Sequence, residues 1–425
     1  MKVLIIGGGG REHAIAMAVN QSKHLTKLYC APGNGGTGMV GENVNIGAMD
    51  FLRLADFAEK EKIDLTIVGM DDPLVGGIVD VFDERGLRIF GPNKKAAIIE
   101  GSKSFAKDLM KKYQIPTAGY ETFEDSQSAL EHLENCSYPV VIKADGLALG
   151  KGVLICEDQK TAMDGVKEFM MEHKFGDAGN KIVIEEFMEG REVSVLSFVD
   201  GEHIQLLSSA QDHKRACDYD QGLNTGGMGT FSPSPFYTEE VDEFCKQYVY
   251  QATVDAMKSE GRTFKGVLFF GLMLTKEGPK VLEYNARFGD PEAQVILPRM
   301  KTDILDIMNA CLDGTLNQIE IEFEDNAAVC VVLASKGYPL EYEKNKLIQG
   351  LEHFENCLDL FCFHAGTALR DGQIYSNGGR VLGITALGSD LVQARANAYK
   401  AVELVQFENK YYRTDIGKAI EQTQS

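Results

Sequence analysis

The sequence lacks the features that mark several classes of protein. Its 425 residues contain no apolar stretch long enough to span a bilayer. Its nine cysteines are an odd number and include no C-x-x-C pair, which argues against a disulfide framework and against a zinc site. The first apolar run leads straight into a glycine loop without a cleavable signal pattern. We therefore expect a cytoplasmic protein with no membrane partner.

The sequence also lacks an excess of basic residues. Lysine and arginine total 43 against 63 aspartate and glutamate residues, which gives a formal net charge of -20 at pH 7. Because no basic stripe is present to neutralise phosphates, nucleic acid is excluded as an expected partner. An anionic small ligand would have to be held by a local cluster of lysines, arginines, Mg2+ and backbone amides.

A dinucleotide fingerprint is absent from the glycine loop at residues 7–10. The loop lies between an apolar strand and a helical pattern, but neither register matches G-x-G-x-x-G, because Glu12 or His13 stands at the third glycine position. A nicotinamide or flavin site is therefore not expected. The loop predicts a phosphate site, a domain interface or a simple turn that packs a helix on a sheet.

A Walker A loop is absent as well, although a lysine and glycine loop are present. A buried strand is expected over 138–145, and Lys143 at its end is costly to bury without an anion. The loop at 146–152 then returns into another strand, and Gly152 follows Lys151 where Walker A requires serine or threonine. The pattern indicates a hairpin-like lid, with a generic glycine hairpin as the alternative.

The apolar runs predict a multidomain α/β protein. Strands expected at 2–6, 28–31, 63–69 and 89–91 alternate with helices that include 51–60 and 74–85. This alternation predicts an N-terminal doubly wound parallel α/β domain over residues 1–100.

The rest of the chain predicts two further α+β units. The first covers 101–324, with helices at 96–113 and 237–259, strands at 266–274 and 279–283, and a lid subdomain at about 121–192. The second covers 325–425, with strands at 327–334, 358–365, 374–376 and 381–387 and a helix at 389–405.

The most informative run is 281–294, where an apolar strand ends in a polar loop. Glu283 and Asn285 are two residues apart, so their side chains leave the same face of a strand and offer hard oxygen ligands that suit Mg2+. Arg287 continues that face, and a metal beside a guanidinium suits a phosphate chain or an acyl phosphate. The alternative is an ordinary solvated loop after a strand.

Residues 287–294, Arg-Phe-Gly-Asp-Pro-Glu-Ala-Gln, resemble the signature of the glycinamide ribonucleotide synthetase family of the ATP-grasp superfamily. Residues 378–382 and 412–417 are similar to the family's C-terminal motifs, so the resemblance runs from Gly7 to Gly417. It implies central ATP-grasp domains and an ATP-dependent carbon–nitrogen ligase. The implied reaction joins glycine to 5-phosphoribosylamine through a glycyl phosphate, with ADP and phosphate released, in de novo purine biosynthesis.

The resemblance implies ATP and Mg2+, or Mn2+, as cofactors, with Glu283 and Asn285 as metal ligands. No acid occurs at 271–275 to complete the metal shell as in many ATP-grasp enzymes. Backbone at 185–188 would read the adenine edge, and Glu192 would bind the ribose hydroxyls. The implied nucleotide-binding residues are Lys103, Lys143, Gly150, Lys151, Gly152, Glu185, Glu186, Phe187, Met188 and Glu192.

The longest segment without an apolar period, 211–229, is similar to the family's substrate loop. His213 within it is either a base or a structural or phosphate-facing histidine. The candidate catalytic residues are Arg287, Lys143 and Asp212. The implied substrate-binding residues are Gly9, Gly10, Arg11, Asp212, Lys214, Asn224, Thr225, Gly226, Gly227, Arg287, Asp290 and Pro291.

Two other functions stay open at this point. The chain could be another ATP-grasp carboxylate–amine ligase with a different acceptor, or a non-catalytic nucleotide-binding module. The expected partners are the small molecules glycine and 5-phosphoribosylamine. We expect a monomer, with weak contacts to other purine-pathway enzymes as an option.

Overall fold

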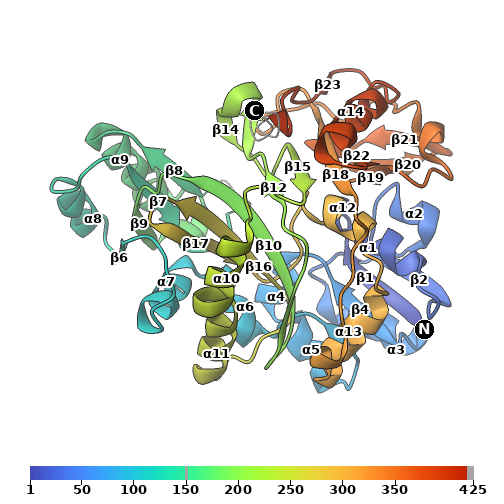
Figure 1. Ribbon diagram of the computed structural model, residues 1–425, viewed down its shortest axis with the longest axis horizontal. Coiled ribbons are helices and arrows are strands. Elements are labelled where there is room, and N and C mark those ends of the chain that lie inside the picture. Colours follow the sequence, from blue (N-terminus) through green and yellow to red (C-terminus); the bar gives the residue numbers. More distant parts are fainter. Residues whose placement is uncertain (149–151, 419–425) are drawn as a thin grey trace.

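The computed structural model describes residues 1–148 and 152–418. In Figure 1 the N-terminal part in blue and the C-terminal part in red lie on one side of the molecule, and the part that carries α8 and α9 projects on the other. The predicted nucleotide-binding residues Gly150 and Lys151 lie outside the described residues. Within those residues, no helix is both long and apolar enough to cross a bilayer.

The N-terminal domain is the doubly wound parallel α/β domain that the sequence predicts. Its strands follow the order β3-β2-β1-β4-β5 and are all parallel. The strands are β1 (Lys2–Gly7), β2 (Lys27–Pro32), β3 (Glu42–Asn43), β4 (Leu65–Val68) and β5 (Ile89–Phe90). The helices are α1 (Gly10–Asn20), α2 (Thr37–Val40), α3 (Phe51–Glu61), α4 (Asp71–Gly76) and α5 (Ile78–Glu84). The loops after β1 and β4 share the crevice where the strand order reverses.

Two predicted helices are each broken in the structure. The helix expected at 74–85 is split into α4 and α5 at Gly77, whose φ of 97° is open to glycine but strained for other residues. The helix expected at 96–113 is split into α6 (Lys94–Gly101) and α7 (Lys103–Lys112). Ser102 is extended there and caps α7 by accepting a hydrogen bond from the Phe105 amide.

The projecting part, called the lid below, is an antiparallel sheet in the order β6-β9-β7-β8. Its helices α8 and α9 pack on the apolar side chains of the sheet. The strands are β6 (Tyr120–Phe123), β7 (Val140–Ala144), β8 (Val153–Cys156) and β9 (Ile182–Glu186), and the helices are α8 (Ser126–Leu133) and α9 (Gln159–Val166).

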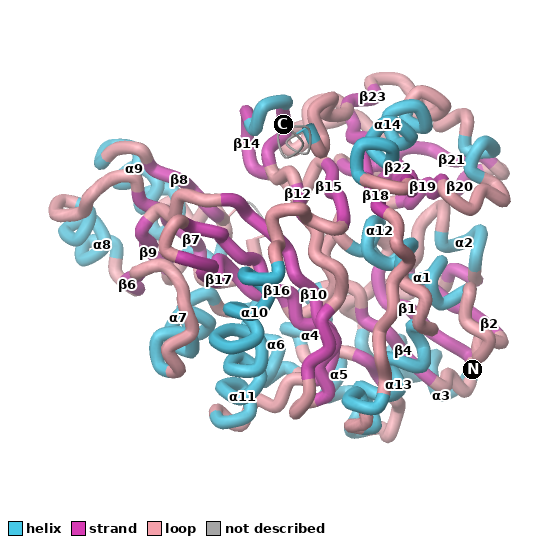
Figure 2. Tube along the Cα trace, viewed as in Figure 1, coloured by secondary structure: helices cyan, strands magenta, loops and turns pink. Residues whose placement is uncertain are grey.

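The central sheet is antiparallel in the order β11-β10-β16-β17. One face packs on α6, α7, α10 (Glu239–Cys245) and α11 (Gln251–Ser259), as Figure 2 shows for the last two helices. The other face packs on the N-terminal domain, α12 (Ala293–Ile296) and α13 (Ile304–Asp313). The strands are β10 (Arg191–Asp200), β11 (Ile204–Leu206), β16 (Lys265–Thr275) and β17 (Gly278–Asn285).

The C-terminal sheet follows the order β12-β15-β18-β22-β19, with β23 also paired to β18. Two of its strands come from the segment 211–232, so this sheet joins the substrate loop to the C-terminal part. The strands are β12 (Gln211–Asp212), β15 (Gly229–Ser232), β18 (Ala327–Ser335), β19 (Leu360–His364), β22 (Arg380–Gly388) and β23 (Lys410–Tyr411). Helix α14 (Leu391–Val402) packs on β22 and β18, and β20 (Thr367–Arg370) pairs with β21 (Gln373–Ser376).

Candidate functional site

The candidate metal residues lie at the end of the edge strand β17. Glu283 and Asn285 are both half-buried, and Tyr284 between them is buried, which matches side chains that leave the same face. Glu283 does not stand alone, because Lys214 Nζ lies 3.1 Å from its Oε1. Lys214, Lys143 and Lys103 lower the pKa of Glu283 to about 2, against the opposing effect of burial. Glu283 is therefore ionised at neutral pH and presents an oxygen ligand.

Lys214 also reaches the residue expected to contact the ribose. Its Nζ lies 2.8 Å from Glu192 Oε2, so one ammonium joins the start of β10 to the end of β17. Although burial opposes the charge, these carboxylates raise the pKa of Lys214 well above its ordinary value. The substrate loop thus contacts both the expected ribose residue and the expected metal residue.

A second lysine cluster lies between the lid and the central sheet. Lys143 Nζ lies 2.9 Å from Glu185 Oε1 and donates a hydrogen bond to the Leu282 carbonyl at 3.3 Å. Lys103 Nζ donates to the Gly146 carbonyl at 3.1 Å, and burial lowers its pKa. Gly152 accepts from the Ala144 amide at 2.8 Å, which closes the base of the glycine loop.

Sequence reasoning missed Lys107, which belongs to this cluster. Its Nζ lies 2.9 Å from Glu185 Oε2, and both side chains are at most 3% exposed. The Glu185 side chain thus binds two lysines, whereas the expectation concerned only its backbone. Lys107 follows Lys103 by four residues on α7, and this spacing on one helix face was the signal available in the sequence.

The predicted hinge joins the two sheets, since β9 belongs to the lid and β10 to the central sheet. Met188 is buried against Ala118 and Met273, a small apolar cluster that suits a flat aromatic base. Phe187 is half-buried, and Glu186 is exposed with its carboxylate 3.9 Å from Lys280. This arrangement places apolar walls beside the backbone expected to read adenine.

Arg287 points to the N-terminal domain and the α6 end. Its Nη2 lies 2.8 Å from Glu100 Oε1 and 3.6 Å from Asp71 Oδ2. Glu100 also accepts a hydrogen bond from the Ala286 amide at 2.7 Å, while burial raises its pKa. The Nε of Arg287 is buried and has no hydrogen-bond partner among the described residues. This free donor is suited to an anionic ligand.

Two carboxyl groups face each other beside the substrate loop. Burial, followed by the charge of Glu292, raises the pKa of Asp212 well above its ordinary value. Burial also raises the pKa of Glu292, whose Oε1 accepts a hydrogen bond from Ser194 Oγ at 2.9 Å. Asp212 accepts one from the His213 amide at 2.7 Å. Such a pair retains a proton to a higher pH than isolated carboxyl groups do.

His213 has a structural environment. Its Nδ1 lies 3.1 Å from the Gly229 carbonyl, and its Nε2 accepts a hydrogen bond from the Gly417 amide at 3.2 Å. Burial lowers its pKa to about 4. A neutral ring with both nitrogens engaged favours the structural alternative over a catalytic base.

Arg380, on β22, ties the glycines of the substrate loop to the turn after β17. It donates to the carbonyls of Gly226 at 2.7 Å and Asp290 at 2.8 Å, and its Nη2 lies 3.1 Å from Asp290 Oδ2. Thr225 Oγ1 donates to the Lys214 carbonyl and accepts from the Gly227 amide. Sequence analysis noted the motif around Arg380 but gave this residue no role.

The remaining candidate residues lie around the same loop. Asn224 ends β14 (Gln221–Asn224), which pairs with β13 (Arg215–Cys217), so the segment expected as a loop contains a hairpin. A Cβ on Gly227 would lie 2.5 Å from Pro291 Cδ, so the backbone of Gly227 packs against Pro291 with no room for a side chain.

The glycine loop after β1 is brought to the same region. Gly9 donates its amide to Glu12 Oε2 at 2.5 Å, and Arg11 donates to the Gly69 carbonyl. A Cβ on Gly10 would lie 2.5 Å from Gln294 Nε2, so a larger residue at this position would have to displace the Gln294 amide. The loop therefore packs directly against the segment after Asp290.

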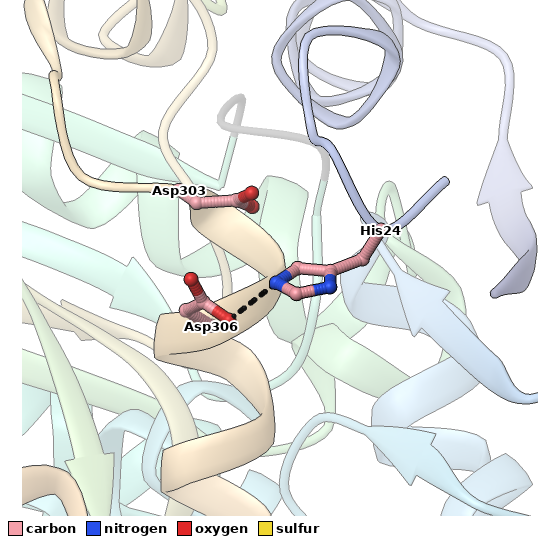
Figure 3. A group of neighbouring side chains, drawn as sticks. All are labelled: His24, Asp303 and Asp306. Carbon is pink, nitrogen blue, oxygen red and sulfur yellow. Dashed lines mark ion pairs between the residues drawn. The ribbon is translucent and has the colours of Figure 1, made fainter.

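A group of potential metal ligands lies elsewhere, at the start of α13. Figure 3 shows His24, Asp303 and Asp306, with His24 Nε2 2.9 Å from Asp306 Oδ1. Asp303 caps α13 by accepting from the Leu305 amide at 3.0 Å, and it also accepts from Ser22. A helix cap at Asp303 and an ion pair between His24 and Asp306 therefore explain why these three side chains lie together.

Solved structures define the class of fold. A biotin carboxylase domain from Hydrogenobacter thermophilus, described as a complex with MgADP, superimposes with a TM-score of 0.76 at 16% identity, over 97% of this chain and 91% of that one. An ATP-grasp family model matches residues 101–293. The chain therefore has an ATP-grasp fold.

The chain belongs to the phosphoribosylglycinamide synthetase family. The models of the family's N domain, ATP-grasp domain and C domain match residues 1–100, 101–293 and 328–419. A phosphoribosylamine–glycine ligase from Caldanaerobacter subterraneus is 51% identical over 98% of this chain and 99% of its own. The crystal structure of such a ligase from Thermotoga maritima matches with a TM-score of 0.84 at 35% identity, over 98% of this chain and 100% of that one.

Proposed function

We propose that this protein is an ATP-dependent ligase that joins glycine to 5-phosphoribosylamine, with glycinamide ribonucleotide, ADP and phosphate as products. The observation that carries this proposal is the 51% identity to a phosphoribosylamine–glycine ligase over nearly the whole of both chains. This similarity includes the substrate loop as well as the ATP-grasp core, and so it supports the acceptor as well as the reaction.

The lysine cluster suits the nucleotide phosphates. Lys107 and Lys143 share the single carboxylate of Glu185, so this buried group of three carries an excess positive charge. Lys103 adds a further ammonium that contacts the Gly146 carbonyl. A buried positive charge without its own anion is costly, and a phosphate oxygen is the anion that fits here.

The end of β17 suits a magnesium ion. Glu283 offers an ionised carboxylate and Asn285 an amide oxygen, the hard ligands that Mg2+ and Mn2+ accept. These two residues would hold the ion, which supplies charge neutralisation to the phosphate chain when bound. Lys214 Nζ contacts Oε1 of this carboxylate, so Lys214 and the ion would share the charge of Glu283 or compete for it.

The proposed chemistry has two steps and needs no protein nucleophile. A glycine carboxylate oxygen attacks the γ-phosphorus of ATP, and ADP leaves. The phosphoribosylamine nitrogen then attacks the carbonyl carbon of glycyl phosphate, phosphate leaves, and the nitrogen loses a proton. Lys143 and Arg287 are assigned to hold the phosphate and carboxylate charges, so most of the catalysis is positioning and electrostatics.

Asp212 is assigned to the proton that the amine loses. Its raised pKa makes it, once ionised, a stronger base than an ordinary aspartate, and it lies on the substrate loop. Water must be kept from glycyl phosphate, and this need gives the lid over the lysine cluster a purpose.

We further propose a cytoplasmic monomer, with weak contacts to other purine-pathway enzymes as an option. All nine cysteines lie in the described residues and are free, and Cys217 and Cys357 are exposed. Exposed free thiols are compatible with a reducing compartment. Sedimentation of the purified protein at several concentrations tests the monomer.

The function is tested by measuring ADP release with ATP, Mg2+, glycine and freshly made phosphoribosylamine, leaving out one component at a time. Release that requires both glycine and phosphoribosylamine is the expected result. Release with glycine but no phosphoribosylamine would indicate a different acceptor, and no release with any combination would favour a nucleotide-binding module.

A further inference from the structure

Lys107 holds one side of a carboxylate whose other side binds a lysine assigned to ATP. Glu185 presents Oε2 to Lys107 and Oε1 to Lys143, each at 2.9 Å. The three side chains are between 2% and 6% exposed, so water does not screen these contacts. Among the described residues, Glu185 is the one ion-pair partner of Lys107.

The position of Lys107 is fixed from a second side. Its Nζ donates a hydrogen bond to Thr117 Oγ1 at 2.8 Å, and Thr117 in turn donates to the Val281 carbonyl at 2.7 Å. The neighbouring Leu282 carbonyl accepts from Lys143 at 3.3 Å. Both lysines are therefore anchored to β17 two residues or fewer before Glu283.

The charges show what this arrangement does. If Glu185 faced Lys143 alone, the pair would be neutral, and the carboxylate would draw Lys143 away from an anionic ligand. With Lys107 present, the carboxylate is shared and the group retains one positive charge. Removing Lys107 would leave the whole Glu185 carboxylate to Lys143, so the effect is passed on to Lys143.

We propose that Lys107 is a positioning residue for ATP: by occupying one oxygen of Glu185 it leaves the charge of Lys143 only partly neutralised and so available to the nucleotide phosphates. This inference rests on the proposed function only in naming ATP as the ligand. Burial lowers the pKa of Lys107 to about 8. Its proton is therefore lost within a pH range that a binding experiment can reach.

The direct test is the dissociation constant of ATP without glycine or phosphoribosylamine, measured by calorimetry. Lys107→Met should weaken ATP about tenfold or more, the size of one lost charge-assisted contact. The double variant Lys107→Met with Glu185→Gln should regain most of that loss, because no carboxylate is left to neutralise Lys143. Lys111→Met, on an exposed position of the same helix, is the matched control and should bind ATP as the parent does.

The double variant separates positioning from a structural role. A merely structural Lys107 would make the double variant as weak as or weaker than Lys107→Met, and that result overturns the proposal. An unchanged dissociation constant in Lys107→Met overturns it too. Circular dichroism spectra of each variant verify that the fold is retained.

The pH dependence gives a test that needs no charge-deleting variant. In the parent protein, ATP should bind more weakly as the pH rises through about 8, where Lys107 loses its proton. Lys107→Arg should bind ATP at pH 7 and lose this dependence, because arginine stays protonated. Equal pH dependence in the two proteins overturns the proposal. The omission assay on the parent protein decides the ligase function separately, since ATP binding alone is measured here.

Discussion

The ammonium of Lys214 lies 3.1 Å from Oε1 of Glu283, and so a lysine of the substrate loop occupies an oxygen that the proposed metal would use. The same ammonium lies 2.8 Å from Glu192. A divalent cation and the ribose would therefore each compete with Lys214.

Replacing Lys214 with methionine should make divalent cations bind more tightly in the absence of nucleotide. The cation would no longer have to displace an ammonium from Glu283, and the two carboxylates would lack their shared partner. Titration of Mn2+ followed by electron paramagnetic resonance measures this affinity. Lys276→Met, in the exposed turn between β16 and β17, is the control. Equal Mn2+ affinity in Lys214→Met and the parent would contradict the competition.

Replacing Glu283 with alanine should reduce turnover by about a hundredfold or more while the fold is retained. The carboxylate is ionised at neutral pH and is the one charged member of the proposed metal pair. ADP release at ordinary Mg2+ is the measurement, and Glu283→Gln should be impaired as well, because it keeps the shape but not the charge. Near-normal turnover in either variant at ordinary Mg2+ would rule out the assignment of this residue as a metal ligand.

The strands were the most predictable part of the fold. Runs such as 2–6 and 266–274 are continuous and apolar because they are buried on both faces, and this signal is local. The break at Ser102 was not predictable, since the end of β7 imposes it: Asp145 accepts from the Ser104 amide at 2.6 Å and from Ser102. The pairing of β15 with β18 joins residues about a hundred apart and leaves no local trace.

The residues of the candidate site also differ in how far local sequence predicts their placement. The shared face of Glu283 and Asn285 could be predicted because a spacing of two on a strand puts both side chains on one side, whereas their role as metal ligands stays a prediction. The spacing of Lys103 and Lys107 on one helix face was visible in the sequence, but the contact of Lys107 with Glu185 and that of Arg380 with Asp290 arise only in the tertiary fold. The sequence shows an ordinary amphipathic helix at Lys107 and a glycine turn at Arg380.

Replacing His213 with glutamine should reduce the pH dependence of stability. The folded-state pKa of about 4 is below the ordinary 6.5, so the unfolded chain binds the proton more readily. The contribution is fully present above pH 6.5 and is lost as the pH falls toward 4. By pH 5 the part of this contribution that has been lost amounts to about 2 kcal/mol. Urea unfolding at pH 7.5 and pH 5 should show the free-energy gap between the parent and His213→Gln narrowing at the lower pH. A constant gap would mean that His213 is not buried in its neutral form.

Replacing Arg380 with methionine should loosen the substrate loop without affecting nucleotide binding. Arg380, on β22, contacts both the Gly226 carbonyl and Asp290. The lysine cluster is held by other contacts, such as that of Lys143 with Glu185. We expect KM for glycine or phosphoribosylamine to rise about tenfold or more, since a charge-assisted contact is lost on each side, and KM for ATP to stay within about twofold. Faster hydrogen exchange at residues 224–229 should accompany the change. Arg370→Met, on an exposed position of β20, serves as the control. An equal rise in KM for ATP, or unchanged exchange at 224–229, would show that Arg380 supports the fold as a whole instead of holding this loop against the turn after β17.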